Sequence, residues 1–387
     1  MKFSKRMDGL DSAIFSVLDD KKRELYDKGM EVINLSVGTP DMPPASHILK
    51  TLSQEAGKAA NYIYALSELP ELIDAVIAWY SRRYGVELLK DEVLSMSGSQ
   101  DGLTHIALTL ADPGDLVMVP DPGYPIFSVG PSLSCAILYK IPLLKENSFL
   151  MDFDKIAPDI AHQTRLIIVS YPNNPVTAIA PPEFYEKLVW FAKKYDIAVV
   201  HDNAYSELVY DGNRGGSFLS IPGAKEVGIE FNSLSKSYNI PGCRISFALG
   251  NKDMIKQLKT LKSHIDYGVF LPVQKAAIAA LTGPQDCVVE TVATYQRRRD
   301  VLIDSFQKIG WSIPKNPGTM FVWAPIPDNY SSSVEFTLDL MEKTGVIVVP
   351  GSSFGERGEG YVRLALVQPE DKIIKASRLI NQSGIFK

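Results

Sequence analysis

The feature that most constrains the fold is a series of short, uninterrupted apolar runs separated by segments with helical spacing. These runs occupy residues 116–119, 166–169, 197–200 and 245–249, and residues 183–195 have the apolar periodicity of a helix. Strands that are buried on both faces read as continuous apolar runs, whereas half-buried strands alternate between apolar and polar residues. The pattern therefore predicts an α/β fold with a mostly parallel sheet that has helices on both faces.

The pattern of the sequence changes after about residue 285. A chain of 387 residues is too long for a single small core, so one large and one small domain are expected. We expect a large domain of residues 48–285 and a smaller α+β domain of residues 1–47 and 286–387. The segments that predict the small domain are a charged helix near residues 290–308, strands at 319–323, 346–349 and 361–366, a helix at 334–343 and a final helix.

Composition excludes several classes of partner. The net charge of −5 gives no electrostatic basis for binding nucleic acid or an anionic membrane. The first ten residues lack the apolar run of a signal peptide, and no stretch approaches the roughly 20 apolar residues of a membrane span. The three cysteines are widely spaced and form no CxxC pair, which argues against a metal site. We therefore expect a cytoplasmic protein with reduced thiols and no metal.

A lysine in a short hydroxyl-rich string is the first candidate for chemistry. Lys236 stands between Ser235 and Ser237, shortly after the apolar run at residues 227–231. A lysine enclosed in a site can lose its proton and form a Schiff base with a carbonyl compound. Taken alone, the string is weak evidence and is more typical of a lysine on a surface loop.

Polar residues follow two of the apolar runs. Asp202 comes after residues 197–200, and Asn174 comes after residues 166–169. In an open α/β sheet, groups that bind ligands gather at the carboxyl ends of the strands. A carboxylate there suits the pyridine nitrogen of pyridoxal phosphate (PLP), and the Asn174 amide and the Tyr205 hydroxyl suit its phenolic oxygen. The alternatives are an N-cap aspartate and an ordinary Asn-Pro turn.

A phosphate group would need an anion site, and residues 97–101 (Ser-Gly-Ser-Gln-Asp) provide a candidate. They directly precede a predicted helix with an apolar stripe over residues 103–110. Free amides at a helix N-terminus bind anions, and the small residues allow close approach. Ser233, Ser235 and Arg244 can add hydroxyls and a guanidinium. Helix capping alone explains the string equally well.

Taken together and in order, these strings make the chain similar to the class I/II aminotransferases of PLP fold type I. Asp202 and Tyr205 are three residues apart and Lys236 and Arg244 are eight apart, as in that family. The matching strings, within about residues 34–365, are Asn34-Leu-Ser-Val-Gly-Thr-Pro-Asp41, Ser97-Gly-Ser-Gln100, Asp121-Pro-Gly-Tyr124, Asn173-Asn-Pro175, Asp202 to Tyr205, Ser233 to Lys236, Arg244 and Tyr361-Val-Arg363.

The resemblance implies a seven-stranded sheet and assigns the cofactor contacts. Lys236 would carry PLP as a Schiff base and move the proton during catalysis. Asp202 would pair with the pyridine nitrogen, Asn174 and Tyr205 would bond the ring oxygen, and Tyr124 would stack on the ring. The residues implied to hold the phosphate are Ser99, Gln100, Ser233, Ser235 and Arg244.

The resemblance also implies how a substrate and a second subunit contribute. Arg363 would bind the substrate α-carboxylate in a bidentate salt bridge, and Asn174 and the backbone of Gly38 would also contact the substrate. Phe15 occupies a place where some relatives carry a tyrosine near the substrate. In this family the site is shared within a homodimer. A partner tyrosine reaches the phosphate, for which Tyr64 is the first choice and Tyr62 the second, and Tyr267 also approaches from the partner.

The sequence departs from the family pattern at three places. Val176-Thr177 replaces the common Thr-Gly after Asn174-Pro175, and Glu68 stands where the loop usually has glycine. No arginine lies between Lys252 and Gln296, where the aspartate-specialised branch has its distal arginine. The strings look closest to the branch with LL-diaminopimelate and alanine aminotransferases.

The expected activity is ping-pong transfer of an amino group between a small L-amino acid, such as glutamate, alanine or LL-diaminopimelate, and a 2-oxo acid. One alternative is another fold-type I reaction, C–S β-elimination or decarboxylation, because the cofactor contacts would look the same. The other is a PLP-binding regulatory module, which the lack of a basic segment disfavours.

Overall fold

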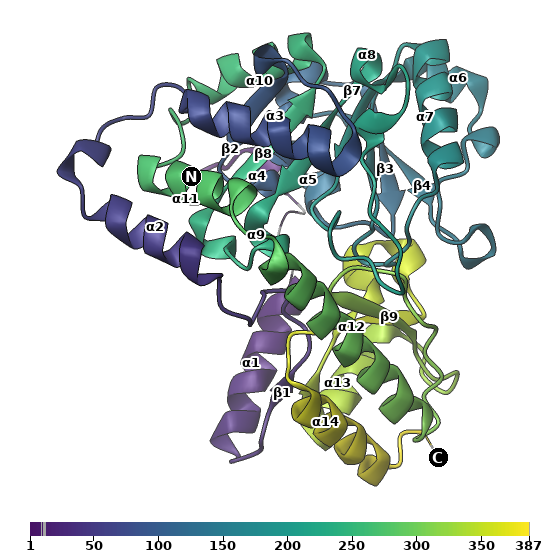
Figure 1. Cartoon of the computed structure of the whole chain (residues 1–387). Helices are drawn as coiled ribbons and strands as arrows, with labels where there is room; N and C mark the ends of the chain where they lie inside the picture. Colours follow the sequence, from purple (N-terminus) through teal and green to yellow (C-terminus); the bar gives the residue numbers. More distant parts are fainter. Residues whose placement is uncertain (9, 11–12, 387) are drawn as a thin grey trace.

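The computed structural model describes residues 1–8, 10 and 13–386, without the side chains of residues 13–15. Its secondary structure forms two bodies, a larger one above and a smaller one below in Figure 1. The larger body is built on a seven-stranded sheet and the smaller one on a three-stranded sheet. The smaller body combines C-terminal segments with helix α1 (Ala13–Asp27), which lies next to them, whereas the N-terminus itself lies beside the larger body.

The large sheet is mostly parallel, as the sequence predicts. Its strand order is β2-β8-β7-β6-β5-β3-β4. Strands β4, β3, β5, β6 and β7 pair in parallel, and β8 runs antiparallel to both of its neighbours. The strands are β2 (Val93–Met96), β3 (Leu116–Asp121), β4 (Ile137–Pro142), β5 (Thr164–Ser170), β6 (Ala198–Asp202), β7 (Gly228–Ser233) and β8 (Ser246–Gly250).

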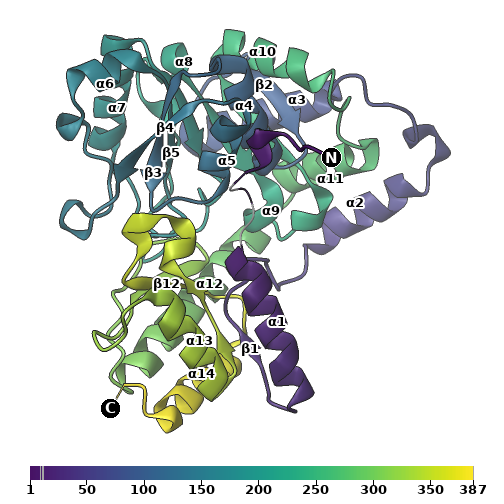
Figure 2. The ribbon, with the colours of Figure 1, turned by 180° about the vertical axis from the view of Figure 1, so that it is seen from behind.

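Helices cover both faces of this sheet because the central strands are apolar on both sides. One face packs against α3 and α7, with buried residues such as Val76 and Leu188. The other face packs against α4, α5 and α10, with buried residues such as Ile106 and Leu258; Figure 2 shows this side. The helices of this body are α2 (Ser46–Ala56), α3 (Pro70–Tyr84), α4 (Ser99–Leu110), α5 (Ile126–Leu133), α6 (Pro158–Gln163), α7 (Pro182–Tyr195), α8 (Ala224–Val227), α9 (Leu234–Ser237), α10 (Lys252–Lys262) and α11 (Leu271–Thr282).

The smaller body has its own apolar core, which includes Trp311, Phe336 and Leu364. Its antiparallel sheet has the order β11-β12-β9, and strand β1 near the N-terminus pairs in parallel with β10. The elements are β1 (Ile33–Asn34), β9 (Phe321–Pro325), β10 (Val346–Ile347), β11 (Val349–Pro350), β12 (Tyr361–Ala365), α12 (Asp286–Gln307), α13 (Ser333–Thr344) and α14 (Glu370–Ser383). The domain boundaries expected from the sequence stay a prediction.

Two strands of the large sheet were not predicted from the sequence. Strand β2 has only four residues, too few to show a period. Strand β4 lies at the sheet edge and exposes several of its side chains, so its residues do not form the continuous apolar run of a central strand.

Among the described residues, no helix has both the length and the apolar character needed to cross a membrane.

Candidate active site

A cavity of about 370 Å³ lies at the carboxyl ends of the parallel strands, where the two bodies meet. Side chains from distant parts of the sequence converge there because each follows a strand that ends at the same edge of the sheet. Ten of the eleven expected cofactor residues line it, together with the expected substrate residues Gly38 and Arg363. These ten are Ser99, Gln100, Tyr124, Asn174, Asp202, Tyr205, Ser233, Ser235, Lys236 and Arg244.

Other expected residues do not line this cavity. Tyr64 and Tyr267 lie on the surface, 78% and 55% exposed, and their ring centres are 5.1 Å apart in an edge-to-face arrangement. The side chain of Phe15 lies outside the described part of the chain. Sequence reasoning also missed several lining residues: Thr39, Leu103, Ala204, Pro241 and Phe321. Thr39 directly follows Gly38, so proximity in sequence was an available signal, whereas the inward side of the strand with Phe321 was not.

Lys236 projects from the short helix α9, which starts directly after β7. Its Nζ atom donates a hydrogen bond to the carbonyl oxygen of Gly38 at 2.7 Å. Burial, together with the nearby cations Arg363 and Arg244, lowers the pKa of this amine to about 8, while Asp202 opposes the shift. An amine with this pKa is partly neutral near physiological pH, which is the state that attacks a carbonyl group.

Asp202 is the last residue of β6, and its carboxylate lies in the cavity wall. Burial raises its pKa to about 6, against the influence of His201 and a hydrogen bond from the Ala204 amide. The Ala204 N–H donates to Oδ1 at 3.3 Å. A buried carboxylate without a cationic partner is costly, so this position suits a ligand that brings a protonated ring nitrogen.

The cavity also contains a cradle for an anion at the N-terminus of α4. Gly98 has a φ of 93°, and the guanidinium of Arg244 fills the space that a Cβ atom on Gly98 would need. The hydroxyl of Ser99 is buried and has no hydrogen-bond partner. Ser233 Oγ lies 3.0 Å from Ser235 Oγ. Free amides, hydroxyls and a guanidinium together make a binding site for a phosphate group.

Arg363 is a buried arginine on β12 that faces the cavity between two aromatic rings. Its guanidinium carbon lies 4.1 Å from the ring centre of Phe321 and 4.7 Å from that of Phe354. Nη1 donates to Asn174 Oδ1 at 2.9 Å, Nη2 donates to Ser36 O at 3.0 Å, and Nε is buried without a partner. Burial lowers its pKa to about 10, so it is still a cation at neutral pH. The two rings fix the plane of the guanidinium group, and its paired N–H groups match the two oxygens of a carboxylate.

The two departures in local sequence leave the surrounding turns intact. Thr177 has a φ of 63°, a left-handed conformation that is strained for a β-branched residue and natural for the glycine of relatives. The turn is nevertheless closed, because Thr177 N donates to Asn173 O at 3.0 Å. Glu68 accepts hydrogen bonds from the backbone and hydroxyl of Ser95, so it ties the segment with Tyr64 to β2.

The residues present fit PLP, by three independent observations. The amine of Lys236 is enclosed and has a lowered pKa. The hydroxyl of Ser99 is buried without a hydrogen-bond partner, next to Gly98, where a Cβ atom would collide with the guanidinium of Arg244. The carboxyl group of Asp202 is buried on the wall of the same cavity. An aldehyde, a phosphate and a basic ring nitrogen would satisfy these three groups in turn.

Comparisons with known proteins agree with this chemistry. The family model "Aminotransferase class I and II" matches residues 30–377. LL-diaminopimelate aminotransferase from Moorella thermoacetica is 44% identical over 97% of both chains. A probable N-succinyldiaminopimelate aminotransferase from Thermus thermophilus is a structural neighbour with a TM-score of 0.90 and 32% identity, covering 96% of this chain and 100% of that one. Substrate-bound BacF from Bacillus subtilis has a TM-score of 0.94 and 34% identity, covering 99% and 98%.

A family model that spans most of the chain and relatives of this similarity over nearly its full length leave one assignment. The chain belongs to the class I and II aminotransferases, the PLP-dependent transaminases.

Proposed function

We propose that this aminotransferase takes LL-diaminopimelate as its preferred amino donor and a small 2-oxo acid, such as 2-oxoglutarate or pyruvate, as acceptor. The observation that carries the substrate class is the buried guanidinium of Arg363, which is held between Phe321 and Phe354 and has an unpartnered Nε. The name of the relatives, LL-diaminopimelate aminotransferase, supports the choice of donor. Glutamate and alanine are the other donors that the sequence suggests.

Arg363 binds the α-carboxylate of the donor. In the structure, the Nη1 atom of its guanidinium group donates to Asn174 Oδ1 and the Nη2 atom donates to Ser36 O. A carboxylate that approaches the guanidinium group takes the place of these two neutral acceptors and forms a pair of charge-assisted hydrogen bonds. Since Asn174 touches both Arg363 and the cavity that holds the cofactor, it links the two binding sites. The α-carboxylate contact is common to all amino acids, so it fixes the substrate class and leaves the side chain to other residues.

Lys236 acts as the base and acid of the reaction. When bound, PLP supplies an aldehyde that condenses with amines and a ring that withdraws electrons from the substrate Cα. The Nζ atom of Lys236 would take the proton from the donor's Cα and deliver it to the reacting carbon of the cofactor. Its lowered pKa, about 8, fits this role because a base that works near neutral pH needs a pKa in that range.

Four side chains would hold the ring of PLP: Asp202, Asn174, Tyr205 and Tyr124. The Asp202 carboxylate would keep the ring nitrogen protonated, and the side chains of Asn174 and Tyr205 would bond the ring oxygen. Tyr124 would cover one face of the ring. The phosphate would be held by Ser99, Gln100, Ser233, Ser235 and Arg244, as the cradle around Gly98 supports.

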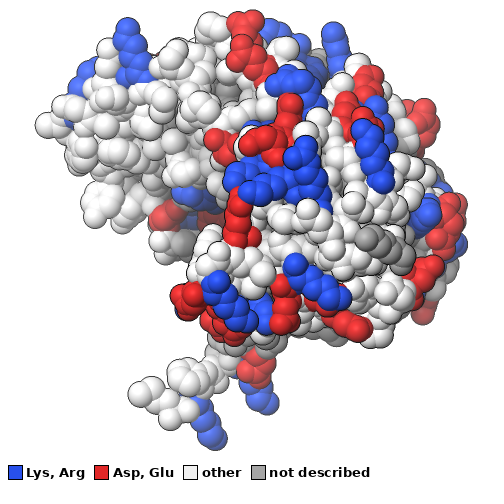
Figure 3. All heavy atoms as spheres, turned by 90° about the horizontal axis from the view of Figure 1, so that it is seen from below, with Lys and Arg blue, Asp and Glu red and all other residues white. Residues whose placement is uncertain are grey.

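We also propose that the active enzyme is a homodimer. The segment after α2 exposes Tyr62, Ile63, Tyr64 and Leu66 by 64%, 66%, 78% and 72%. Exposed apolar patches of this kind mark interfaces, and the lobe at the left of Figure 3, which carries this segment, presents mostly uncharged side chains. The hydroxyl of Tyr62 already donates to Ala56 O at 2.8 Å within its own chain. This bond favours Tyr64 as the residue that reaches the partner's phosphate.

A comparison of donors tests the proposed substrate. The PLP-loaded enzyme is mixed with LL-diaminopimelate, glutamate, alanine or aspartate, and the visible absorbance of the cofactor is followed in single turnovers, with the released acids identified. We expect LL-diaminopimelate to give the highest second-order rate constant. Transfer from glutamate or alanine with none from LL-diaminopimelate would refute the donor assignment alone. Release of sulfide or carbon dioxide from suitable amino acids, without transamination, would favour the alternative fold-type I reactions.

A further inference from the structure

A pair of ionisable side chains is completely buried behind the cofactor site. His201 and Glu230 are opposite each other on β6 and β7, and both side chains are 0% exposed. His201 Nδ1 lies 2.8 Å from Glu230 Oε2. Removing two charges from water costs several kcal/mol per ion unless each is fully hydrogen-bonded, so the surroundings of the pair decide whether it can be charged.

The carboxylate of Glu230 is fully satisfied. It accepts hydrogen bonds from the Tyr80 hydroxyl at 2.7 Å, the Ser217 hydroxyl at 2.9 Å and the Phe218 amide at 2.8 Å, besides the contact with His201. An ionised carboxylate only accepts, and its two oxygens offer about four positions for donors. Four donors therefore match the ionised form.

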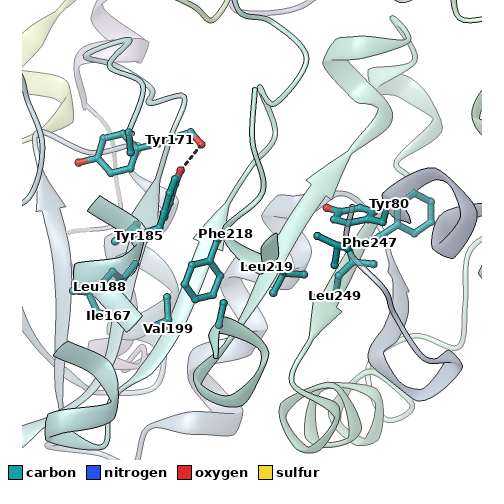
Figure 4. Packing of buried hydrophobic residues seen from close by; sticks show 14 of the residues in the cluster. Tyr80, Ile167, Tyr171, Tyr185, Leu188, Val199, Phe218, Leu219, Phe247 and Leu249 are labelled. Atoms are coloured by element: carbon teal, nitrogen blue, oxygen red, sulfur yellow. Dashed lines mark hydrogen bonds between the residues drawn. The ribbon is translucent and has the colours of Figure 1, made fainter. Parts of the chain in front are cut away.

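The second nitrogen of His201 also faces an acceptor. Nε2 lies 3.1 Å from the carbonyl oxygen of Tyr171 and 3.2 Å from the hydroxyl of Tyr185. The Tyr185 hydroxyl in turn donates to the Tyr171 carbonyl, a bond drawn in Figure 4. With a carboxylate at one nitrogen and a carbonyl at the other, a ring with protons on both nitrogens satisfies both acceptors.

This pair connects the three segments that carry the main cofactor contacts. Side chains alternate across a strand, so His201 faces the α7 side of the sheet while its neighbour Asp202 faces the cavity. The backbone carbonyl of Tyr171, which lies 3.1 Å from His201 Nε2, belongs to the segment after β5 that carries Asn174. Glu230 lies on β7, which leads directly into α9 and Lys236.

We propose that His201 is a positioning residue, whose cation, held by Glu230 on the far face of the sheet, keeps Asp202 ionised and holds the segments of Asn174 and Lys236 in register. This inference rests on the proposed contact between Asp202 and the cofactor ring. It assigns a role in the active site to His201 and Glu230, two residues that neither the cofactor nor the substrate would contact.

The electrostatic part of the inference has a definite direction. Burial raises the pKa of Asp202 to about 6, His201 lowers it, Glu230 raises it and Lys236 lowers it. The other groups that face Asp202 are the Ala204 amide and the hydroxyls of Tyr124 and Tyr205. Removing the His201 cation should therefore raise the pH at which Asp202 ionises, and removing the Glu230 anion should lower it.

Two single substitutions test this prediction. His201→Asn keeps a donor near Glu230 without the charge, and Glu230→Gln removes the negative charge at nearly constant shape. The affinity of the apoprotein for PLP is measured by absorbance titration between pH 5.5 and 8.5, and its thermal midpoint is recorded in parallel. Ionisation of free PLP is common to all variants, so the difference between variants reports the protein.

We expect His201→Asn to move the pH midpoint of PLP binding upward and Glu230→Gln to move it downward. At pH 6 the first variant should bind about fivefold more weakly, because a rise of one unit from a pKa of about 6 lowers the ionised fraction of Asp202 from about one half to about one tenth. A purely structural role would lower the thermal midpoint and weaken binding in both variants without opposite shifts of the pH profile, and that result would overturn the inference.

A measurement on the unmutated protein covers the case in which the variants do not fold. The chain has five histidines, so the ring nitrogens can be observed by NMR after labelling with [¹⁵N]histidine. One ring that stays buried from solvent should carry protons on both nitrogens at pH 7.5. If every ring is neutral at that pH, the cation does not exist and the proposal fails.

The contact between Asp202 and the cofactor is tested separately with Asp202→Asn. If this variant binds PLP with the wild-type pH profile, the proposed role of Asp202 is wrong. If it changes the profile while His201→Asn leaves it unaltered, only the inference about His201 is wrong.

Discussion

The guanidinium of Arg244 fills the space beside Gly98 that any other residue would need for its Cβ atom. Gly98 directly precedes α4, and Arg244 follows α9 by seven residues, so the two belong to separate segments of the anion cradle. The glycine has a φ of 93°, a conformation that L residues rarely adopt. The conformation of the backbone therefore favours glycine at position 98, and a Cβ atom there would displace the guanidinium of Arg244 from its present place.

Replacement of Gly98 by alanine should weaken cofactor binding more than it destabilises the fold. Gly114→Ala is a matched control, because Gly114 has the same φ of 93° and nothing within 4 Å of its would-be Cβ atom. Each substitution strains the backbone by about 1–3 kcal/mol. Only Gly98→Ala also displaces Arg244, so we expect its dissociation constant for PLP, measured by absorbance titration, to rise at least tenfold above that of Gly114→Ala (about 1.4 kcal/mol). Equal affinities would show that the cradle tolerates a Cβ atom.

Asp202→Asn should stabilise the apoprotein while it weakens the binding of PLP. Since burial raises the pKa of Asp202 to about 6 from 3.8, the folded protein holds this proton more tightly than the unfolded chain. The stability that the group contributes is present below about pH 4 and is lost as pH rises through 6. At pH 8 the neutral amide should therefore raise the free energy of unfolding of the apoprotein by up to about 3 kcal/mol.

Urea unfolding of both apoproteins at pH 5 and pH 8 measures this difference, which should grow with pH. A variant that is less stable than the wild type at pH 8 would mean that the carboxylate has a stabilising partner in the cofactor-free protein.

Arg363→Lys should impair every amino donor. Lysine keeps the charge but lacks the planar fork and the contact with the rings of Phe321 and Phe354. Charge-assisted hydrogen bonds contribute about 1.5–3 kcal/mol, so kcat/KM should fall roughly 10- to 100-fold, mainly through a higher KM. Arg297→Lys makes the same chemical change at a half-exposed surface pair with Glu370 and should leave the constants unchanged. Impairment of a single donor would identify Arg363 as a reader of the substrate side chain.

A charge in the exposed apolar segment should disrupt assembly. Leu66 is 72% exposed next to Tyr64, and Leu89, at 63% exposed, is a control elsewhere on the surface. In sedimentation velocity, Leu66→Glu should shift the protein from the proposed dimer to monomer. It should also lower the affinity for PLP, because Tyr64 of a second subunit would no longer reach the site. Leu89→Glu should sediment as the wild type. A fully active wild-type monomer would rule out the shared site.

The sequence predicted most of the cavity wall because the relevant residues directly follow apolar strands. Asp202 ends β6 and Asn174 lies in the turn after β5, and parallel strands end at one edge of a sheet. These contacts depend on chain order and strand direction alone. The ordered strings that resemble the family then gave each residue a role.

What could not be predicted depends on which side of a strand a residue faces and on strand register. Phe321 and Phe354 hold Arg363, but β9 is short and apolar on both sides, so its sequence does not tell which residue faces the cavity. His201 and Glu230 form their buried pair only because β6 and β7 align them. Each residue alone reads as an ordinary polar residue near a strand end.

Covalent trapping of the cofactor tests the central claim most directly. The PLP-loaded enzyme is reduced with sodium borohydride, digested, and its peptides are mapped by mass spectrometry. The lowered pKa of Lys236 and its place beside Asp202 in the cavity predict that the pyridoxyl group is found on Lys236 and that Lys236→Ala retains no reducible adduct. A stoichiometric adduct on any other lysine would contradict the account.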